Sequence, residues 1–254
     1  MLQTRIIPCL QLINDSLVKT IKFKEYNYIG DPINTVRIFN ELEVDELCFL
    51  DIRATIEKRK PNIDILHQIA NECFMPLAYG GGINTFEIAK EIFSIGFEKV
   101  VINTSAWSDP HLIKKISEYY GIQAVVVSID VRKNIWGKYQ VYVADGTQKI
   151  SISLNEYLQK VEEEGAGEIL ITSMDRDGTW SGFDIELIKL VSKSVSIPVI
   201  ANGGAGNIDH IGQAIHSGEA SAVALGSMVV FQKKGMGVLV NFPDNEKLKT
   251  ILNK

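Results

Sequence analysis

The sequence has little cysteine, no excess of basic residues and no long apolar run, and each shortage excludes a class of protein. Its 254 residues include three cysteines, too few for the disulfide framework of a secreted scaffold. The net charge of −5 argues against nucleic-acid binding by bulk electrostatics. Apolar runs stay below the roughly 20 residues of a membrane span, and residues 1–12 are too polar at their ends for a secretory signal. We expect a cytoplasmic protein without nucleic-acid or membrane partners.

Residues that commonly bind metals are scattered. Cys9, Cys48 and Cys73 are widely spaced in apolar surroundings, as is typical of reduced core residues. The four histidines form no pair with metal-ligand spacing. We therefore expect neither a metal nor another cofactor.

Short apolar runs rich in β-branched residues alternate with stretches of helical periodicity along the whole chain. This order predicts an α/β protein with a closed parallel barrel, the (β/α)8 or TIM barrel. No linker rich in Pro, Gly or Ser divides the chain, so residues 1–254 are expected to form one domain. The expected strands are 5–12, 46–51, 76–79, 99–103, 124–130, 168–173, 198–202 and 221–226, and the expected helices are 32–42, 62–73, 85–95, 109–120, 154–164, 184–194, 208–217 and 245–252.

The second half of the chain repeats features of the first. Gly80-Gly81-Gly82 follows the third expected strand, and Gly203-Gly204 follows the seventh. Asn103-Thr104 and Gly226-Ser227 end the fourth and eighth strands in the same way. A repeat of this kind is typical of a duplicated unit, which predicts a barrel built from two similar half-barrels.

These repeated glycines predict two phosphate sites. The working residues of such barrels lie at the carboxyl ends of the strands, where glycine lets backbone N–H groups approach an anion. The alternative is that the glycines only form tight turns. The first phosphate site would contain Gly81, Gly82, Asn103 and Thr104. The second would contain Asp177, Gly178, Gly203, Gly204, Gly226 and Ser227. We expect a ligand with phosphates at both ends, or one phosphate and another anionic group.

Longer motifs carry a resemblance over nearly the whole chain. Residues 5–10 (RIIPCL), 165–170 (GAGEIL), 173–179 (SMDRDGT) and 196–205 (SIPVIANGGA) resemble the synthase (cyclase) subunit of imidazole glycerol phosphate synthase. The resemblance implies a lyase that receives ammonia from a glutaminase subunit. It combines the ammonia with a ribulosyl-aminoimidazole ribotide and yields imidazole glycerol phosphate and a carboxamide ribotide. It also implies two catalytic aspartates, one on the first strand and one on the fifth.

Only one of these aspartates is present. The resemblance places the fifth-strand aspartate at Asp130 and a loop lysine at Lys19, whereas Gln11 occupies the position of the first-strand aspartate. A carboxamide forms hydrogen bonds but cannot shuttle a proton near neutral pH. Asp130, Lys19 and Gln11 are the candidate catalytic residues, and Gln11 puts the cyclase reaction itself in question. Asp130 and Lys19 are otherwise interpreted as solvated charges at a strand end and in a loop.

Four expected strands begin with charges of alternating sign, namely Arg5, Glu46, Lys99 and Glu168. Side chains alternate along a strand, and Arg5, Lys99 and Glu168 are at positions that face the barrel interior. Glu46 and Asp51 are an odd number of residues apart and would face opposite sides, so strand 46–51 would need a bend or bulge for both to face the interior. The four charges are either ordinary solvated charges or a ring that neutralises itself. The resemblance implies the second, an ammonia gate, with the glutaminase docked on this N-terminal face.

Other segments resemble relatives in surface-polysaccharide clusters called acetamidino modification proteins. They are residues 18–24, 30–34 (GDPIN), 73–76 (CFMP), 128–131 (SIDV) and 238–243 (VLVNFP), the last of which has a strand-like pattern. The leading hypothesis is therefore ammonia transfer in the synthesis of acetamidino sugars for lipopolysaccharide, with a sugar amidotransferase as a further partner. The first alternative is the cyclase of histidine biosynthesis. The second is a non-enzymatic scaffold that stimulates a glutaminase.

Two tryptophans lie in expected loops. Residues 175–183 (DRDGTWSGF) contain Trp180 and form either a lid over the ligand or an ordered loop. Trp136 is expected in a hairpin after the fifth strand.

Overall fold

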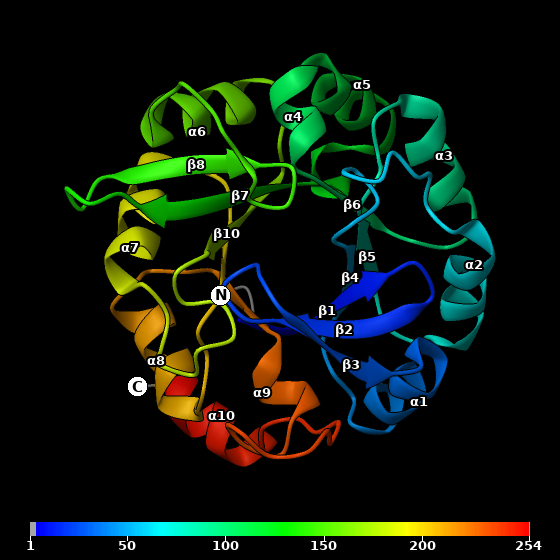
Figure 1. Cartoon of the computed structure of the whole chain (residues 1–254), viewed down its shortest axis with the longest axis vertical. Helices are drawn as coiled ribbons and strands as arrows, with labels where there is room; N and C mark the ends of the chain where they lie inside the picture. Colours follow the sequence, from blue (N-terminus) through cyan, green and yellow to red (C-terminus); the bar gives the residue numbers. More distant parts are fainter. Residues whose placement is uncertain (1–3, 254) are drawn as a thin grey trace.

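The centre of the protein is a closed barrel of parallel strands (Figure 1), seen in a computed structural model that describes residues 4–253. The barrel closes because β1 pairs with both β12 and β4, and β10 pairs with both β7 and β11. The predicted (β/α)8 barrel is therefore confirmed. In order around it, the strands are β1 (Arg5–Ile13), β4 (Leu47–Asp51), β5 (Leu77–Gly80), β6 (Lys99–Ile102), β7 (Val125–Lys133), β10 (Glu168–Ser173), β11 (Val199–Asn202) and β12 (Ala222–Leu225).

Helices surround the barrel, as Figure 1 shows, and each expected helix is present with small differences at its ends. Most of them begin at a residue whose side chain accepts a hydrogen bond from the first turn, such as Asp31, Thr85 or Ser153. The long helices are α1 (Pro32–Glu41), α2 (Ile63–Glu72), α3 (Phe86–Ser94), α5 (His111–Tyr120), α6 (Leu154–Glu163), α7 (Ile185–Ser194), α8 (Ile208–His216) and α10 (Asn245–Leu252). The short ones are α4 (Thr104–Ser108), α9 (Ser227–Val230) and η1 (Ile122–Ala124).

Side-chain alternation along the strands produces two apolar cores. On β4, Leu47 and Phe49 belong to the large core between strands and helices, whereas Cys48 and Leu50 belong to a smaller core inside the bore. The bore is thus filled by side chains, as in other barrels of this type. Asp51 has the parity of Phe49, so β4 needs no bend to orient it, and the expected bend in strand 46–51 is wrong.

Four further strands, all outside the expected set, extend the barrel at the carboxyl ends of its strands. They are β2 (Ser16–Thr20), β3 (Tyr26–Gly30), β8 (Tyr139–Val143) and β9 (Gln148–Lys149). β2 pairs antiparallel with β1, and β8 pairs antiparallel with β7. The turn between β7 and β8 carries Trp136, which confirms the expected hairpin. The strand-like pattern of residues 238–243 gives only one bridge, from Val238 to Phe231.

Matched backbone conformations support the half-barrel repeat. Asn62 and Asp184 precede α2 and α7 with φ and ψ of −80° and 88° and of −81° and 88°. Asn103 and Gly226 precede α4 and α9 with φ and ψ of −123° and −79° and of −101° and −94°. Equivalent places in the two halves therefore share one local geometry.

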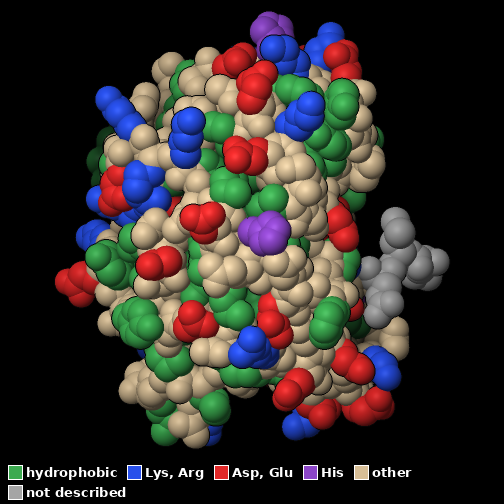
Figure 2. Space-filling view, turned by 90° about the vertical axis from the view of Figure 1, so that its right-hand side faces the viewer, with side chains coloured by type: hydrophobic (Ala, Val, Ile, Leu, Met, Phe, Trp, Pro, Cys, Tyr) green, Lys and Arg blue, Asp and Glu red, His purple; other side chains and the backbone are tan. Residues whose placement is uncertain are grey.

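On the side of the molecule shown in Figure 2, acidic and basic side chains are mixed, with small hydrophobic areas between them. Among residues 4–253, no helix is both long enough and apolar enough to cross a membrane.

The buried aromatic ring of Phe49 offers a test of the packing. It is 0% exposed between β4 and the helices, whereas Phe74, before β5, is 86% exposed. Phe49→Ala should lower the free energy of unfolding by about 3–5 kcal/mol through lost contacts and a cavity. Phe74→Ala should change it by less than about 0.5 kcal/mol. Urea titration followed by circular dichroism measures both, and equal effects would contradict this packing.

Candidate active site at the mouth of the barrel

Two adjoining pockets open at the carboxyl ends of the strands, and each contains one of the predicted phosphate sites. The larger pocket is lined by Gly81, Gly82 and Asn103 from β5 and β6, and by Asp130 from β7. The smaller is lined by the glycines that follow β11 and β12. Gln11, Leu50, Asp177 and Asn202 line both pockets. One elongated ligand could therefore occupy the two.

The first phosphate site depends on glycine. Gly81 and Gly82 have φ of +121° and +68°, and a Cβ on Gly81 would lie 2.5 Å from the Asp51 carbonyl oxygen. Only glycine fits such a close approach of two backbones without strain. Asn103 donates from Nδ2 to the Ser128 carbonyl at 2.9 Å, which fixes the end of β6 at the pocket.

The second predicted phosphate site is likewise formed by glycines with positive φ and close backbone neighbours. Gly203 and Gly204 have φ of +90° and +111°, and a Cβ on Gly204 would lie 2.2 Å from the Gly182 carbonyl oxygen. A Cβ on Gly226 would lie 2.8 Å from Cε of Lys19, so this lysine passes over the glycine. Ser227 is buried at the start of α9 beside them.

Lys19 and Asp177 form a buried ion pair at the edge of the second phosphate site. Nζ of Lys19 lies 2.7 Å from Oδ1 of Asp177, and the Thr20 hydroxyl donates to Oδ2 at 2.7 Å. The Lys22 N–H donates to the Asp177 carbonyl at 3.0 Å. A Cβ on Gly178 would lie 2.5 Å from the Thr20 carbonyl oxygen. The loop after β10 is thereby fastened to the segment after β2.

Gln11 also holds β2 in place through hydrogen bonds. Its Oε1 accepts hydrogen bonds from the Thr20 backbone N–H at 2.8 Å and from the Thr20 hydroxyl at 3.1 Å, with Nζ of Lys19 at 3.4 Å. Gln11 thus has a structural role, which sequence reasoning missed because β2 was not expected.

Asp130 is poised for proton transfer. It is 8% exposed, and Nδ2 of Asn103 donates to its Oδ2 at 3.1 Å. Burial, together with the charges of Asp145 and Asp177, raises the pKa of Asp130 to about 7, although hydrogen bonds from Thr172 and Asn103 oppose the shift. A carboxyl group with this pKa can both donate and accept a proton at neutral pH.

The four strand-start charges meet in a closed ring at the opposite end of the bore. Arg5 lies 2.7 Å from both Glu46 and Glu168. Lys99 lies 2.9 Å from Glu46 and 3.3 Å from Glu168. Each charge has two neighbours of opposite sign, and the interpretation as separate solvated charges is wrong. Next to this charge ring lies a small cavity lined by Glu46, Cys48, Ala78 and other side chains of the bore.

Asp51 lies at the mouth but is held outside the bore. Arg59 donates to both of its carboxylate oxygens, at 3.0 and 3.2 Å, and the Arg53 and Ala54 N–H groups donate to Oδ1 at 3.1 Å. The side chain therefore ties the loop after β4 to the strand.

The loop with Trp180 packs on its neighbour. The Gly182 N–H donates to the Gly204 carbonyl at 2.8 Å, and a Cβ on Gly206 would lie 2.4 Å from the Trp180 carbonyl oxygen. These contacts favour the ordered loop over the lid. Within residues 4–253, no group of His, Cys, Asp and Glu could hold a metal ion.

Asp145 was not among the site residues predicted from the sequence. It lies in the turn after β8 and lines the larger pocket with Asp130. The Asp145-Gly146 pair is typical of a turn. Nothing in the sequence indicates that this turn reaches the mouth.

Comparison with known proteins agrees with this geometry. The profile of the family described as "Histidine biosynthesis protein" matches residues 5–234. The chain belongs to the family of imidazole glycerol phosphate synthase subunits. The "Putative imidazole glycerol phosphate synthase subunit hisF2" of Pseudomonas aeruginosa is 50% identical over 248 residues, 98% of this chain and 99% of that protein. The "Imidazole glycerol phosphate synthase subunit HisF" of a Nostoc species is 40% identical over 245 residues, 95% of both chains.

Membership of the imidazole glycerol phosphate synthase family confirms the expected kind of enzyme. The relatives' names mention no acetamidino sugar or lipopolysaccharide, so they support the cyclase of histidine biosynthesis better than the leading hypothesis.

The raised pKa of Asp130 predicts a pH-dependent stability. The folded protein keeps this proton up to about pH 7, whereas the unfolded chain loses it near 3.8, so stability falls as the pH rises through that window. Asp130→Asn cannot lose a proton. The fall in free energy of unfolding between pH 5 and pH 8 should therefore shrink by about 2 kcal/mol relative to wild type.

Urea titration at both pH values measures this difference. Asp64→Asn, at an exposed carboxylate on α2, is the control and should keep the wild-type fall. An unchanged fall in Asp130→Asn would contradict the assignment.

Proposed function

We propose that this chain is the ammonia-using synthase subunit of a glutamine amidotransferase that acts on a ribulosyl-aminoimidazole ribotide. It yields imidazole glycerol phosphate and a carboxamide ribotide. The observation that carries the proposal is the arrangement along one bore: two adjoining glycine-built pockets lie at the mouth, Asp130 lines the larger of them, and the charge ring closes the other end.

The substrate has a phosphate at each end, which suits two sites on opposite sides of the mouth. Backbone N–H groups at Gly81, Gly82, Gly203 and Gly204 can approach phosphate oxygens because no Cβ intervenes. A ligand bound at both ends would pass Asp130 in the larger pocket, and holding it there converts a bimolecular encounter into an intramolecular one.

Ammonia would enter through the charge ring from a glutaminase docked on the N-terminal face. The ring is closed, so passage requires one contact to open. Lys99 is the best candidate because its contact with Glu168 is the longest of the four, at 3.3 Å, and its stem is flexible. Neutral ammonia would then cross an apolar bore that excludes ions.

Gln11 favours a second candidate function. The first strand supplies no carboxylate, and Oε1 of Gln11 is already committed to Thr20. A subunit that routes ammonia but transforms a different acceptor would need no acid there. Ammonia transfer in acetamidino sugar formation, with a sugar amidotransferase as acceptor partner, is that candidate.

Ammonium-dependent turnover of the ribulosyl substrate separates the two functions. Wild type should convert it, and Asp130→Asn should lower turnover by about 10²–10⁴-fold because a proton-transfer group is lost. Gln11→Asp should raise turnover if the first-strand carboxylate is limiting. Asp64→Asn is the control. A wild type that gives no product would reject the cyclase in favour of the second candidate.

The charge ring is tested by supplying nitrogen in two ways. Lys99→Met should lower glutamine-dependent turnover measured with the glutaminase, while turnover with added ammonium stays near wild type because the mouth is unchanged. Lys114→Met, on the outer helix α5, is the matched control and should affect neither. Equal losses with both nitrogen sources would contradict a role in ammonia passage.

A further inference from the structure

The larger pocket at the mouth is lined by four carboxylates, Asp51, Asp130, Asp145 and Asp177. Two of them are neutralised by bonded cations. Arg59 donates twice to Asp51, and Lys19 lies 2.7 Å from Asp177. These two carboxylates are fastened to neighbouring loops and are not available for proton transfer to a ligand.

Asp145 has a more distant cation. Its side chain is 13% exposed, and Nη1 of Arg53 lies 3.8 Å from its Oδ2, beyond hydrogen-bond distance. No other residue between 4 and 253 donates a hydrogen bond to this carboxylate. Asp145 and Asp130 are therefore the pocket carboxylates that accept no hydrogen bond from a cation.

The turn that carries Asp145 is firmly positioned. Ala144, Asp145 and Gly146 have φ of 51°, 55° and 70°, and the Ala144 N–H donates to the Thr104 hydroxyl at 3.0 Å. A Cβ on Gly146 would lie 2.1 Å from Cε of Met174 and 3.2 Å from Cδ1 of Phe23. The turn thus touches the first phosphate site, the end of β10 and the segment after β2.

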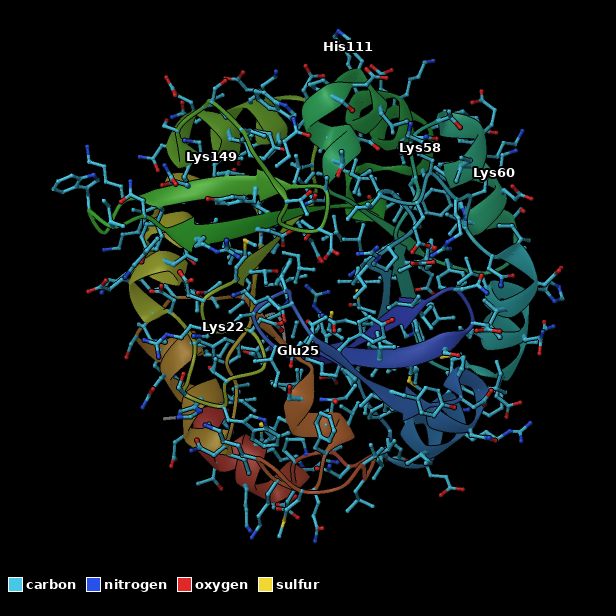
Figure 3. The ribbon with its side chains drawn as sticks, in the orientation of Figure 1. Lys22, Glu25, Lys58, Lys60, His111 and Lys149 are labelled. Atoms are coloured by element: carbon cyan, nitrogen blue, oxygen red, sulfur yellow. The ribbon has the colours of Figure 1, made fainter. Side chains whose placement is uncertain are left out.

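This position places the turn over the mouth. In Figure 3, Lys22, the neighbour of Phe23, lies closer to the barrel axis than Lys58, Lys60 and His111 on the rim. The contacts of Gly146 with Phe23 and Met174 bring the β8–β9 turn toward the same central region. The carboxylate of Asp145 therefore lines the larger pocket from a turn that is held in place by its contacts.

The charge of Asp145 also affects the protonation of Asp130. The charge of Asp145 is the largest influence after burial that raises the pKa of Asp130. Burial raises the pKa of Asp145 to about 6, with Arg53 lowering it and Asp177 raising it. Burial thus raises the pKa of both carboxyl groups toward neutral pH, and Asp145 raises that of Asp130 further. Two neighbouring carboxyl groups in different protonation states can divide the roles of acid and base.

We propose that Asp145 is the second acid–base residue of this active site and supplies the carboxylate that Gln11 lacks. The inference rests on the proposed function, the addition of ammonia to a ribulosyl carbonyl group. The turn after β8, rather than the first strand, provides the group.

The proton steps balance with this pair. When ammonia bonds to the carbonyl carbon, the C=O π electron pair moves to oxygen, which takes the proton of Asp130, while Asp145 takes a proton from nitrogen. When the hydroxyl group leaves as water, Asp145 returns its proton to that oxygen and Asp130 takes a proton from nitrogen. The carbonyl and ammonia become an imine and water, and both carboxyl groups regain their starting states.

The experiment measures ammonium-dependent turnover of the ribulosyl substrate across pH 5 to 9. Asp145→Asn should lower kcat by about 10²-fold, because a proton-transfer group is lost, with KM nearly unchanged. The acidic limb of the pH profile, which reports the base Asp145, should disappear. Asp145→Glu keeps the carboxylate and should recover part of kcat, and Asp64→Asn is the control with wild-type kinetics.

The outcomes distinguish this proposal from the proposed function. An active wild type with an equally active Asp145→Asn and an unchanged pH profile would overturn the role of Asp145 alone. Raised KM without a change in kcat would also overturn it, since that result describes a binding residue. A wild type that makes no product would overturn both proposals.

Discussion

The charge ring in the bore is the constraint on which the remaining structure depends. Taking a charged group out of water costs several kcal/mol unless opposite charges surround it. Arg5 and Glu46 come from neighbouring strands of the first half-barrel, Lys99 comes from β6 and Glu168 from β10. The ring therefore closes only if both halves are in register. Since all four side chains are used in one another's neutralisation, the bore above them can be apolar.

At the mouth, by contrast, buried charges are not all neutralised by one another. Its carboxylates differ in their partners. Asp51 and Asp177 accept hydrogen bonds from Arg59 and Lys19 and hold loops in place, whereas Asp130 and Asp145 accept no hydrogen bond from a cation. Buried carboxyl groups without such partners keep their protons to higher pH. An aspartate that accepts a hydrogen bond from a cation thus holds a loop in place, whereas an aspartate without one is a proposed proton-transfer group.

Particular residues show how far sequence reasoning reached. The parity of Arg5, Lys99 and Glu168 was enough to predict that they share the interior, because side chains alternate strictly along a strand. The parity of Asp51 was observed correctly, but its explanation was wrong, since Arg59 holds it on the helix side of a regular strand. Gln11 was interpreted as a departure from the family pattern, whereas its hydrogen bonds to Thr20 depend on a strand pairing that local pattern does not predict.

The sequence alone determined the barrel, its half-barrel repeat and the glycines of both predicted phosphate sites, because strand and helix periodicity and the need for positive φ are local properties of the chain. Tertiary structure decided which charges meet and which carboxylates remain free of a bonded cation. Asp145 lies close to Asp130 only because β8 folds back along β7 and the next turn packs on Met174 and Phe23. Such neighbours are distant along the chain, and the pKa of a buried group depends on them rather than on adjacent residues.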